Sequence, residues 1–169
     1  MSKLVCLICC FFTALAQPGD VKLKVAAVQL RSTFRVEENM KRIVEILGRL
    51  AADGVNVAAF PECALTGYHK DVAMAVTAEE IAAAEEKIRV ACRDRKIAAV
   101  VGSVYKVNGR TFNSAVVFDS RGELVERYAK VMLAGEKWAT PGNHVAYFEN
   151  AMRKFVRRIL SKESQETGQ

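Results

Sequence analysis

Hydrophobic residues in the first part of the sequence follow first the period of a strand and then the period of a helix. The segment Lys22 to Leu30 alternates and then becomes apolar, which predicts a first strand. From Val36 to Asp53, hydrophobic residues recur at spacings of three and four, which predicts an amphipathic helix that ends before Gly54. The segment Val55 to Phe60 is almost wholly apolar, as is typical of a strand covered on both faces of a parallel sheet.

The same succession of helix and strand then repeats. Thr77 and Glu80 have the spacing of a capping box, so a second helix is expected to begin after Thr77. One face of that helix carries its apolar residues, which are Ile81, Ala84, Ile88, Ala91 and Cys92. The segment Ile97 to Tyr105 has the composition of another buried strand. The order strand, helix, strand, helix, strand predicts a parallel sheet with right-handed crossovers.

Beyond this point the pattern changes to strands joined by tight turns. Val107 to Arg110 contains Asn-Gly, which is a strong signal for a hairpin. Thr111 to Asp119 reads as a strand, Asp119 to Glu123 as a second turn, and Leu124 to Lys130 as a further strand. We therefore predict an α/β fold with a mixed sheet, in which antiparallel strands are added to a parallel start and helices flank the sheet.

The first residues have the pattern of a targeting segment. Lys3 precedes a continuous apolar run from Leu4 to Ala16, and Ala14 and Ala16 occupy the small-residue positions of a cleavage site. The run is shorter than the roughly 20 residues that a membrane-spanning helix needs. We expect residues 1–16 to be a signal peptide cleaved after Ala16, which predicts a secreted or extracytoplasmic protein. An uncleaved anchor and a misassigned start are the alternatives.

Charge is concentrated at the other end of the sequence. The formal net charge is +6, and half of it falls on residues 151–169. The remainder of the chain is only mildly basic, so we expect no nucleic-acid partner. Residues 150–169 read as a basic amphipathic tail, with three interpretations. It covers an exposed sheet face, it binds an acidic membrane surface, or it is the artefact of a truncated or mis-spliced gene model.

Two cysteines, Cys63 and Cys92, lie outside the targeting segment. A pair does not make a disulfide framework, so we predict two separate buried thiols. His69 and His144 are isolated and lack the spacing of metal ligands. We therefore expect no metal site.

Candidate chemistry lies where the predicted strands end. Glu62 follows an apolar strand, and the carboxyl ends of strands are where open α/β sheets bind ligands. A partly desolvated carboxylate there can act as a general base, although one that caps a turn or pairs with a lysine is an equal alternative. Lys130 can stabilise a developing negative charge, or it is an ordinary surface lysine. Glu136, taken alone, reads as a solvated acid in a loop.

Together, these segments resemble the nitrilase, or carbon–nitrogen hydrolase, family over residues 22–149. The resemblance rests on the ordered matches KVAAVQL, FPECALTGY, FNSAVVFDSRGELVERYAKVML and GEKWATPG. It implies part of an α-β-β-α sandwich, namely its N-terminal half. It further implies that Glu62 is the general base for a cysteine thiol, that Lys130 stabilises the tetrahedral intermediate, and that Glu136 positions substrate and lysine. The implied substrate is a small amide, nitrile or carbamoyl compound, with no metal or organic cofactor.

The nucleophile of such a site is expected beyond Gly142, where no cysteine occurs before Gln169. We therefore expect the chain to stop before the nucleophile, which leaves its status as an enzyme open. The alternative function is that of a catalytically inactive family member that acts as a binding or interaction module. An incomplete sandwich would also expose an apolar sheet face, so a homo-oligomer stays open.

Overall fold

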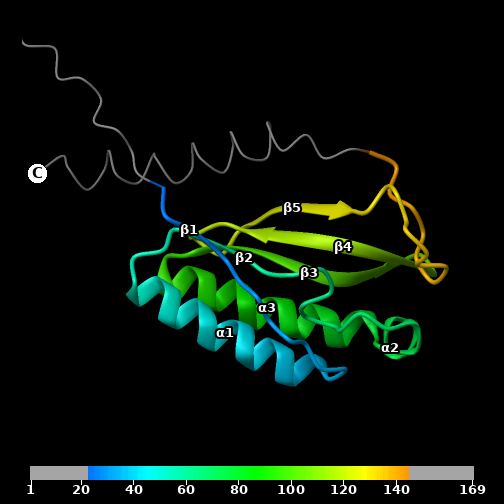
Figure 1. The fold of residues 1–169 in the computed structure, drawn as a ribbon, viewed down its shortest axis with the longest axis horizontal. Helices are drawn as coiled ribbons and strands as arrows, with labels where there is room; N and C mark the ends of the chain where they lie inside the picture. The colour runs from blue at the N-terminus through cyan, green and yellow to red at the C-terminus, as the bar shows by residue number, and fades with distance from the viewer. Residues whose placement is uncertain (1–22, 145–169) are drawn as a thin grey trace, which may run out of the picture.

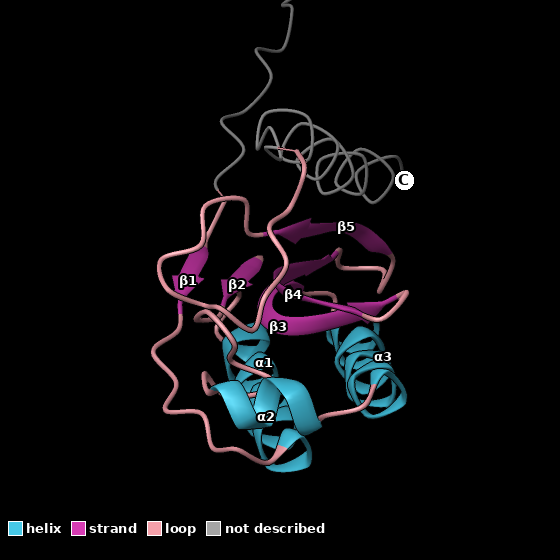
Figure 2. Cartoon of the chain, turned by 90° about the vertical axis from the view of Figure 1, so that its right-hand side faces the viewer, coloured by secondary structure: helices cyan, strands magenta, loops and turns pink. Residues whose placement is uncertain are grey.

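The computed structural model describes residues 23–144, which form a five-stranded sheet with helices on one face (Figures 1 and 2). The strands lie in the order β1-β2-β3-β4-β5, so neighbours in the sheet are also neighbours in sequence. The predicted signal peptide, residues 1–16, and the basic tail, residues 150–169, lie outside the described residues. Within residues 23–144, no helix has the length and apolar character needed to cross a membrane.

The sheet is mixed, as predicted from the hydrophobic pattern. Its strands are β1 (Val25–Ala27), β2 (Val57–Ala59), β3 (Ala98–Val107), β4 (Arg110–Phe118) and β5 (Leu124–Ala129). The first three are parallel, with Val57 paired to Val25 on one side and to Ala98 on the other. β4 pairs antiparallel with both β3 and β5. The tight turn between β3 and β4 places Asn108 and Gly109 at φ +50° and +71°, which explains the Asn-Gly at this position.

The helices connect the parallel strands. They are α1 (Val36–Ala52), α2 (Lys70–Ala75) and α3 (Ala78–Arg95). The predicted start of α3 is confirmed, because the Thr77 hydroxyl accepts a hydrogen bond from the Glu80 amide at 3.1 Å. α1 ends one residue before the predicted limit, and Gly54 follows with φ +72°. The short helix α2 was not predicted, because six residues are too few to display a helical period.

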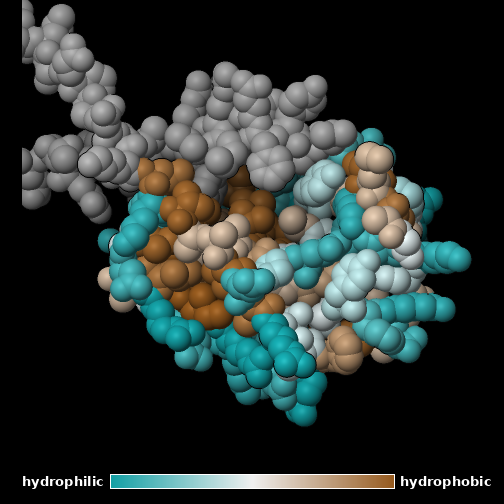
Figure 3. Space-filling view, viewed as in Figure 1, coloured by the Kyte–Doolittle hydropathy of each residue, from teal (hydrophilic) through white to brown (hydrophobic). Residues whose placement is uncertain are grey.

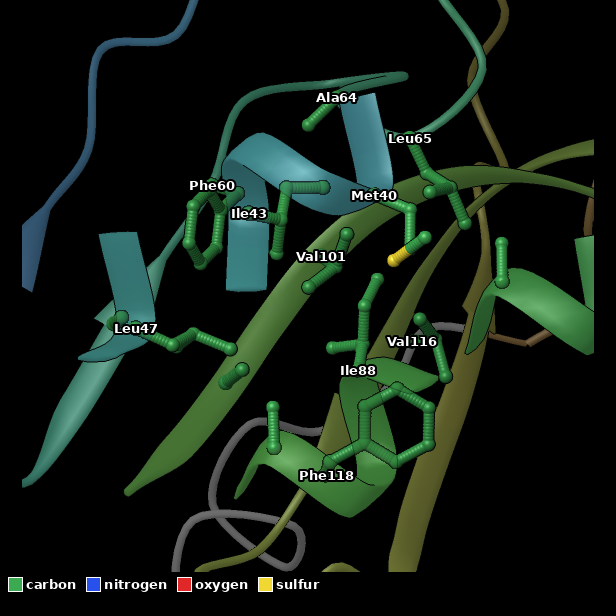
Figure 4. Packing of buried hydrophobic residues seen from close by; sticks show 14 of the residues in the cluster. Met40, Ile43, Leu47, Phe60, Ala64, Leu65, Ile88, Val101, Val116 and Phe118 are labelled. Atoms are coloured by element: carbon green, nitrogen blue, oxygen red, sulfur yellow. The ribbon is translucent and has the colours of Figure 1, made fainter. Parts of the chain in front are cut away.

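The hydrophobic core lies between the sheet and the helices (Figure 4). Ile43 and Leu47 of α1 and Ile88 of α3 are completely buried there. They pack against sheet residues such as Val101 and Val116, which are also completely buried. Since side chains alternate along a strand, Ala99 and Val101 of β3 face this core together with their partners Phe118 and Val116 of β4.

The opposite face of the sheet carries a second and much smaller hydrophobic cluster. Val57 and Ala98 form a separate small cluster with the partly buried Val117. Among the described residues, all the helices lie on the other side of the sheet (Figure 2). At the β1 edge, Val25 remains 58% exposed, and hydrophobic residues gather over the part of the molecule where β1 and β2 lie (Figure 3). We call the sheet face that carries Val57, Ala98 and Val117 the open face.

Candidate functional site

Glu62 lies in a tight turn that follows β2 and rests on β3. The Phe60 amide donates to the Val100 carbonyl, and the Leu65 amide donates to the Gly102 carbonyl at 3.0 Å. A Cβ atom at Gly102 would lie 2.2 Å from the Pro61 carbonyl oxygen, so only glycine permits this approach. The turn therefore fixes Glu62 against the middle of the sheet.

The residue that follows Glu62 has a left-handed backbone conformation. Cys63 has φ +49° and lies inside the turn, which the Gly67 amide closes with a hydrogen bond to the Cys63 carbonyl at 2.7 Å. Asp, Asn and Gly are the usual residues for such a conformation, so the cysteine gave no signal for it.

Lys130 follows the last residue of β5, and Glu136 lies in the loop that comes next. The Lys130 amide donates to the Asn113 carbonyl of β4 at 2.8 Å, and the Gly142 amide donates to the Lys130 carbonyl at 2.9 Å. The loop thus returns to the strand from which it departed. Glu136 is only 2% exposed, and its Oε2 accepts a hydrogen bond from the Ala134 amide at 2.6 Å. The local sequence had predicted a solvated side chain for Glu136, and this prediction is wrong.

The structure brings the three predicted site residues together. The Nζ atom of Lys130 lies 2.9 Å from Oε1 of Glu62, although 68 positions separate the two residues in sequence. The same Nζ atom also donates to Oε1 of Glu136. One ammonium group thus bridges two carboxylates, and Glu136 has the interior position while the Glu62 side chain remains 47% exposed.

A fourth residue of the cluster, Asn113 on β4, was not singled out from the sequence. Its Nδ2 donates to Oε1 of Glu62 at 2.6 Å and lies 3.3 Å from Oε1 of Glu136. Its Oδ1 accepts a weak hydrogen bond from the Cys63 thiol, with 3.7 Å between the sulfur and the oxygen. Asn113 is 3% exposed. The sequence carried only a weak signal for it, because an amide within a predicted strand does not reveal whether its face of the sheet is buried.

The charges of the cluster stabilise one another. The hydrogen bond from Lys130 lowers the pKa of Glu136 from its ordinary 4.5 to about 2. Hydrogen bonds to Glu136 and then to Glu62 raise the pKa of Lys130 above its usual value. Lys130 is therefore a permanent cation at neutral pH, suited to electrostatic stabilisation and not to accepting a proton.

The two thiols of the described residues are free and buried, as predicted. Burial raises the pKa of Cys63 to about 12, and the nearby Glu62 carboxylate acts in the same direction. Burial likewise raises the pKa of Cys92 to about 12. Neither side chain is a thiolate at neutral pH, and a thiolate is the form that attacks carbon.

A shallow pocket of about 350 Å³ opens beside the cluster on the open face of the sheet. Glu62, Asn113 and Lys130 provide its polar side. The rest of its lining is mostly apolar and consists of Phe60, Gly102, Ser114, Ala115 and Tyr128. Glu136 does not line the pocket, so it acts on any bound molecule through Lys130.

Two aromatic rings, Tyr68 and Trp138, lie near the buried carboxylate. Their centroids are 6.4 Å apart in an edge-to-face arrangement. Desolvation raises the pKa of Tyr68, and Glu136 raises it further through its charge and a hydrogen bond. Within residues 23–144, no group of three or more His, Cys, Asp or Glu side chains is arranged to hold a metal ion.

The mixed sheet and the lysine held between two glutamates, one at the mouth of a pocket, define an α/β domain with a preorganised charged site. Residues 24–157 match the family model for carbon-nitrogen hydrolase. The chain therefore belongs to the carbon–nitrogen hydrolase family, and the predicted resemblance is confirmed.

Individual relatives agree with this assignment. Nitrilase homolog 2 of Dictyostelium discoideum is 25% identical over 113 residues, which are 65% of this chain and 34% of that protein. An aliphatic nitrilase from Rhodococcus rhodochrous is 30% identical over 124 residues, which are 64% of this chain and 34% of that protein. The crystal structure of an amidase from Nesterenkonia sp. superimposes with a TM-score of 0.68 at 28% identity, covering 72% of this chain and 49% of the amidase. The chain thus spans about a third of these curated relatives and about half of the amidase.

Proposed function

We propose that this domain takes part in hydrolysing the carbon–nitrogen bond of a small amide, nitrile or carbamoyl compound. The observation that carries the proposal is the convergence of Glu62 and Lys130 at the mouth of one pocket, with Glu136 buried behind them. Glu62 is half exposed and can reach a reacting group, whereas the charge of Lys130 is held in place by two carboxylates.

For an amide, the geometry supports the following sequence of proton transfers. Glu62 takes the proton of a cysteine thiol, and the thiolate adds to the carbonyl carbon of the substrate. The ammonium group of Lys130 stabilises the negative charge that develops on the carbonyl oxygen. The protonated Glu62 then gives its proton to the departing nitrogen, which leaves as ammonia or an amine. Water, deprotonated by Glu62, cleaves the thioester, and the thiol is regenerated along with the acid.

The thiol in this scheme comes from outside residues 23–144. Cys63 and Cys92 are completely buried, and the pKa of each thiol is raised to about 12. In a mutant of the amidase from Nesterenkonia sp. AN1, the acetamide moiety of fluoroacetamide is covalently added at that enzyme's active site cysteine. Other mutants of the same amidase form complexes with acrylamide and butyramide. We infer a thiol of equivalent role and a substrate of similar size here.

The inaccessible thiols favour one other function, a binding module without turnover. A pocket that presents a fixed cation and a carboxylate beside apolar walls can hold a small amide through both of its polar atoms. In that case the domain binds the compound, and no bond is broken. The two functions differ in one observable, the release of ammonia.

The decisive experiment measures ammonia released from a panel of small amides and nitriles. It compares the 169-residue chain with the product of the longest reading frame that contains it. We expect Glu62→Gln and Lys130→Met to lower the rate of the active form by about 10²-fold to 10⁴-fold. Glu79→Gln, a change at an exposed glutamate on α3, is the matched control and should leave the rate unchanged. Ammonia release that is insensitive to Glu62→Gln, or absent from both proteins, would overturn the hydrolase proposal.

A further inference from the structure

We propose that Asn113 is a positioning residue of this site, whose side-chain amide holds Glu62 and Glu136 in one geometry around Lys130. A role for Asn113 in catalysis rests on the proposed function, whereas its effect on the two carboxyl groups does not. Asn113 contacts Glu62, Glu136 and Lys130, and it is the member of the cluster to which the sequence resemblance assigned no role.

The orientation of the Asn113 amide is determined by its neighbours. Both carboxylates accept hydrogen bonds, so the Nδ2 group, which has two hydrogens, must face Glu62 at 2.6 Å and Glu136 at 3.3 Å. The Oδ1 atom then faces the Cys63 thiol at 3.7 Å. Because the alternative orientation would place an oxygen against two carboxylates, the site accepts the amide in one way only.

The backbone of Asn113 fixes the third charged residue. Its carbonyl accepts the amide hydrogen of Lys130 at 2.8 Å, just beyond the pairing of β4 with β5. Its side chain and its main chain therefore set the positions of the carboxylates and the ammonium relative to one strand. Since Asn113 is 3% exposed, water does not replace these contacts.

The cluster needs a neutral donor because its charges do not balance. Two carboxylates share one ammonium, and both approach it through their Oε1 atoms. Two ionised carboxylates at one site repel each other, and this repulsion favours protonation of one of them. An amide that donates to both reduces the repulsion without adding a charge. A hydrogen bond to a carboxylate favours its ionised form, so the bond from Asn113 Nδ2 supports the role of Glu62 as acceptor of a thiol proton.

The titratable groups around Asn113 come from three parts of the chain. Glu62 and Cys63 face it from the turn after β2, Lys130 from the end of β5, and Glu136 from the following loop. Tyr68 contributes indirectly through Glu136. Any test of Asn113 must therefore resolve the carboxylates individually.

The test is a pH titration of the full chain labelled with ¹³C at the glutamate carboxyl carbons, followed by NMR. Glu62→Gln and Glu136→Gln assign the two site signals. We expect Asn113→Asp, which keeps the shape but adds a third carboxylate, to move the midpoint of at least one site carboxyl upward by about one pH unit or more. Asn113→Leu, which removes the donor without adding charge, should move it in the same direction by less.

A matched control separates positioning from stability. Asn39 is a completely buried asparagine of α1, and it donates to the carbonyls of Thr33 and Leu65 without touching the site. Asn39→Asp should destabilise the fold but leave the titration of the site carboxyls unchanged. Site midpoints that stay within about 0.3 pH unit of wild type in Asn113→Leu would overturn the inference, and this variant decides the matter if Asn113→Asp does not fold.

Activity distinguishes the two proposals. In a catalytically active form, Asn113→Leu should shift the acid limb of the kcat/KM profile upward in parallel with the NMR midpoint. An inactive protein whose carboxyl midpoints still respond to Asn113 contradicts the proposed function and leaves the positioning role intact. An active protein whose acid limb does not move contradicts the positioning role alone.

Discussion

The two faces of the sheet differ in what their side chains do, although the same strands build both. Toward the helices, Val101 and Val116 are completely buried among large hydrophobic residues. Toward the open face, the next residues along these strands include Gly102 and Ala115, which form the floor of the pocket. Alternation along a strand thus separates the residues that stabilise the domain from those that shape its site. The contrast predicts that changes one residue apart have different consequences.

The largest effect is expected at Gly102, which lines the pocket and also contacts the turn that carries Glu62. In Gly102→Ala, the new methyl group would lie 2.2 Å from the Pro61 carbonyl oxygen and 2.6 Å from the Cys63 amide nitrogen. These are backbone atoms and cannot rotate away, so the turn that carries Glu62 must shift. We expect the free energy of unfolding to fall by about 3 kcal/mol, the upper end for overpacking, as measured by urea denaturation. Gly48→Ala is the control, because the atoms nearest to its methyl group would belong to the movable guanidinium end of Arg95, at 3.1 Å. Equal stability of the two variants would contradict the prediction.

The next largest effect is the difference in lost unfolding free energy between alanine substitutions at Val101 and at its neighbour Val100. Val101→Ala removes two methyl groups from the helix-facing core, where Val101 is completely buried, and should cost about 2 kcal/mol of unfolding free energy. Val100 points to the open face and is only partly buried, so Val100→Ala should cost less than about 1 kcal/mol. Chemical denaturation of both variants checks the difference. If they prove equally costly, the open face is covered in the full protein as tightly as the helix face.

The helix face was also the part that the sequence predicted best. The spacing of Ile43, Leu47 and Ile88 signalled the buried sides of α1 and α3, because a helix that packs on a sheet must repeat its apolar residues at this period. The Asn-Gly turn and the change to antiparallel strands were also predicted correctly from the sequence. What remained hidden was the six-residue helix α2, which is too short for any period to appear.

The site was predictable only in part. Glu62 was identified because it follows an apolar strand, where open α/β sheets bind ligands. Lys130 was identified because it ends a predicted strand and lies in a segment that resembles the carbon–nitrogen hydrolase family. The burial of Glu136 depends on a loop that folds back onto β5, and no local pattern encodes that return. Asn113 was missed because one amide in an alternating strand resembles any polar residue on a solvated face. Its contacts span 51 positions to Glu62 and 23 to Glu136, so they exist only once the sheet has formed.

A smaller effect is expected from the titration of the site with pH. The pKa of Glu136 is lowered from 4.5 to about 2, so its ionised form stabilises the fold above about pH 4.5, and this contribution is lost as the pH falls toward 2. The pKa of Lys130 is raised above its ordinary 10.5, so the contribution of Lys130 is complete at and below that pH and is lost only in stronger alkali. The urea midpoint of the wild type should therefore fall more steeply between pH 4.5 and 2 than that of Glu136→Gln. The difference is limited, because Lys130 keeps Glu62 as a second partner. Parallel curves for the two proteins would contradict this account.

The smallest effect is expected at Thr77, which caps the start of α3 on the helix side of the sheet. The Thr77 hydroxyl accepts a hydrogen bond from the Glu80 amide, which would otherwise lack a partner at the start of α3. Thr77→Ala should lower the free energy of unfolding by about 1 kcal/mol, whereas Thr77→Ser, which keeps the hydroxyl, should remain close to wild type. Because α3 packs on the face of the sheet that lies away from the pocket, the NMR midpoints of Glu62 and Glu136 should be the same in both variants. A cap mutation that also moved those midpoints would show that the two faces are coupled through the sheet, and that stability and chemistry are less separate than the alternation along its strands implies.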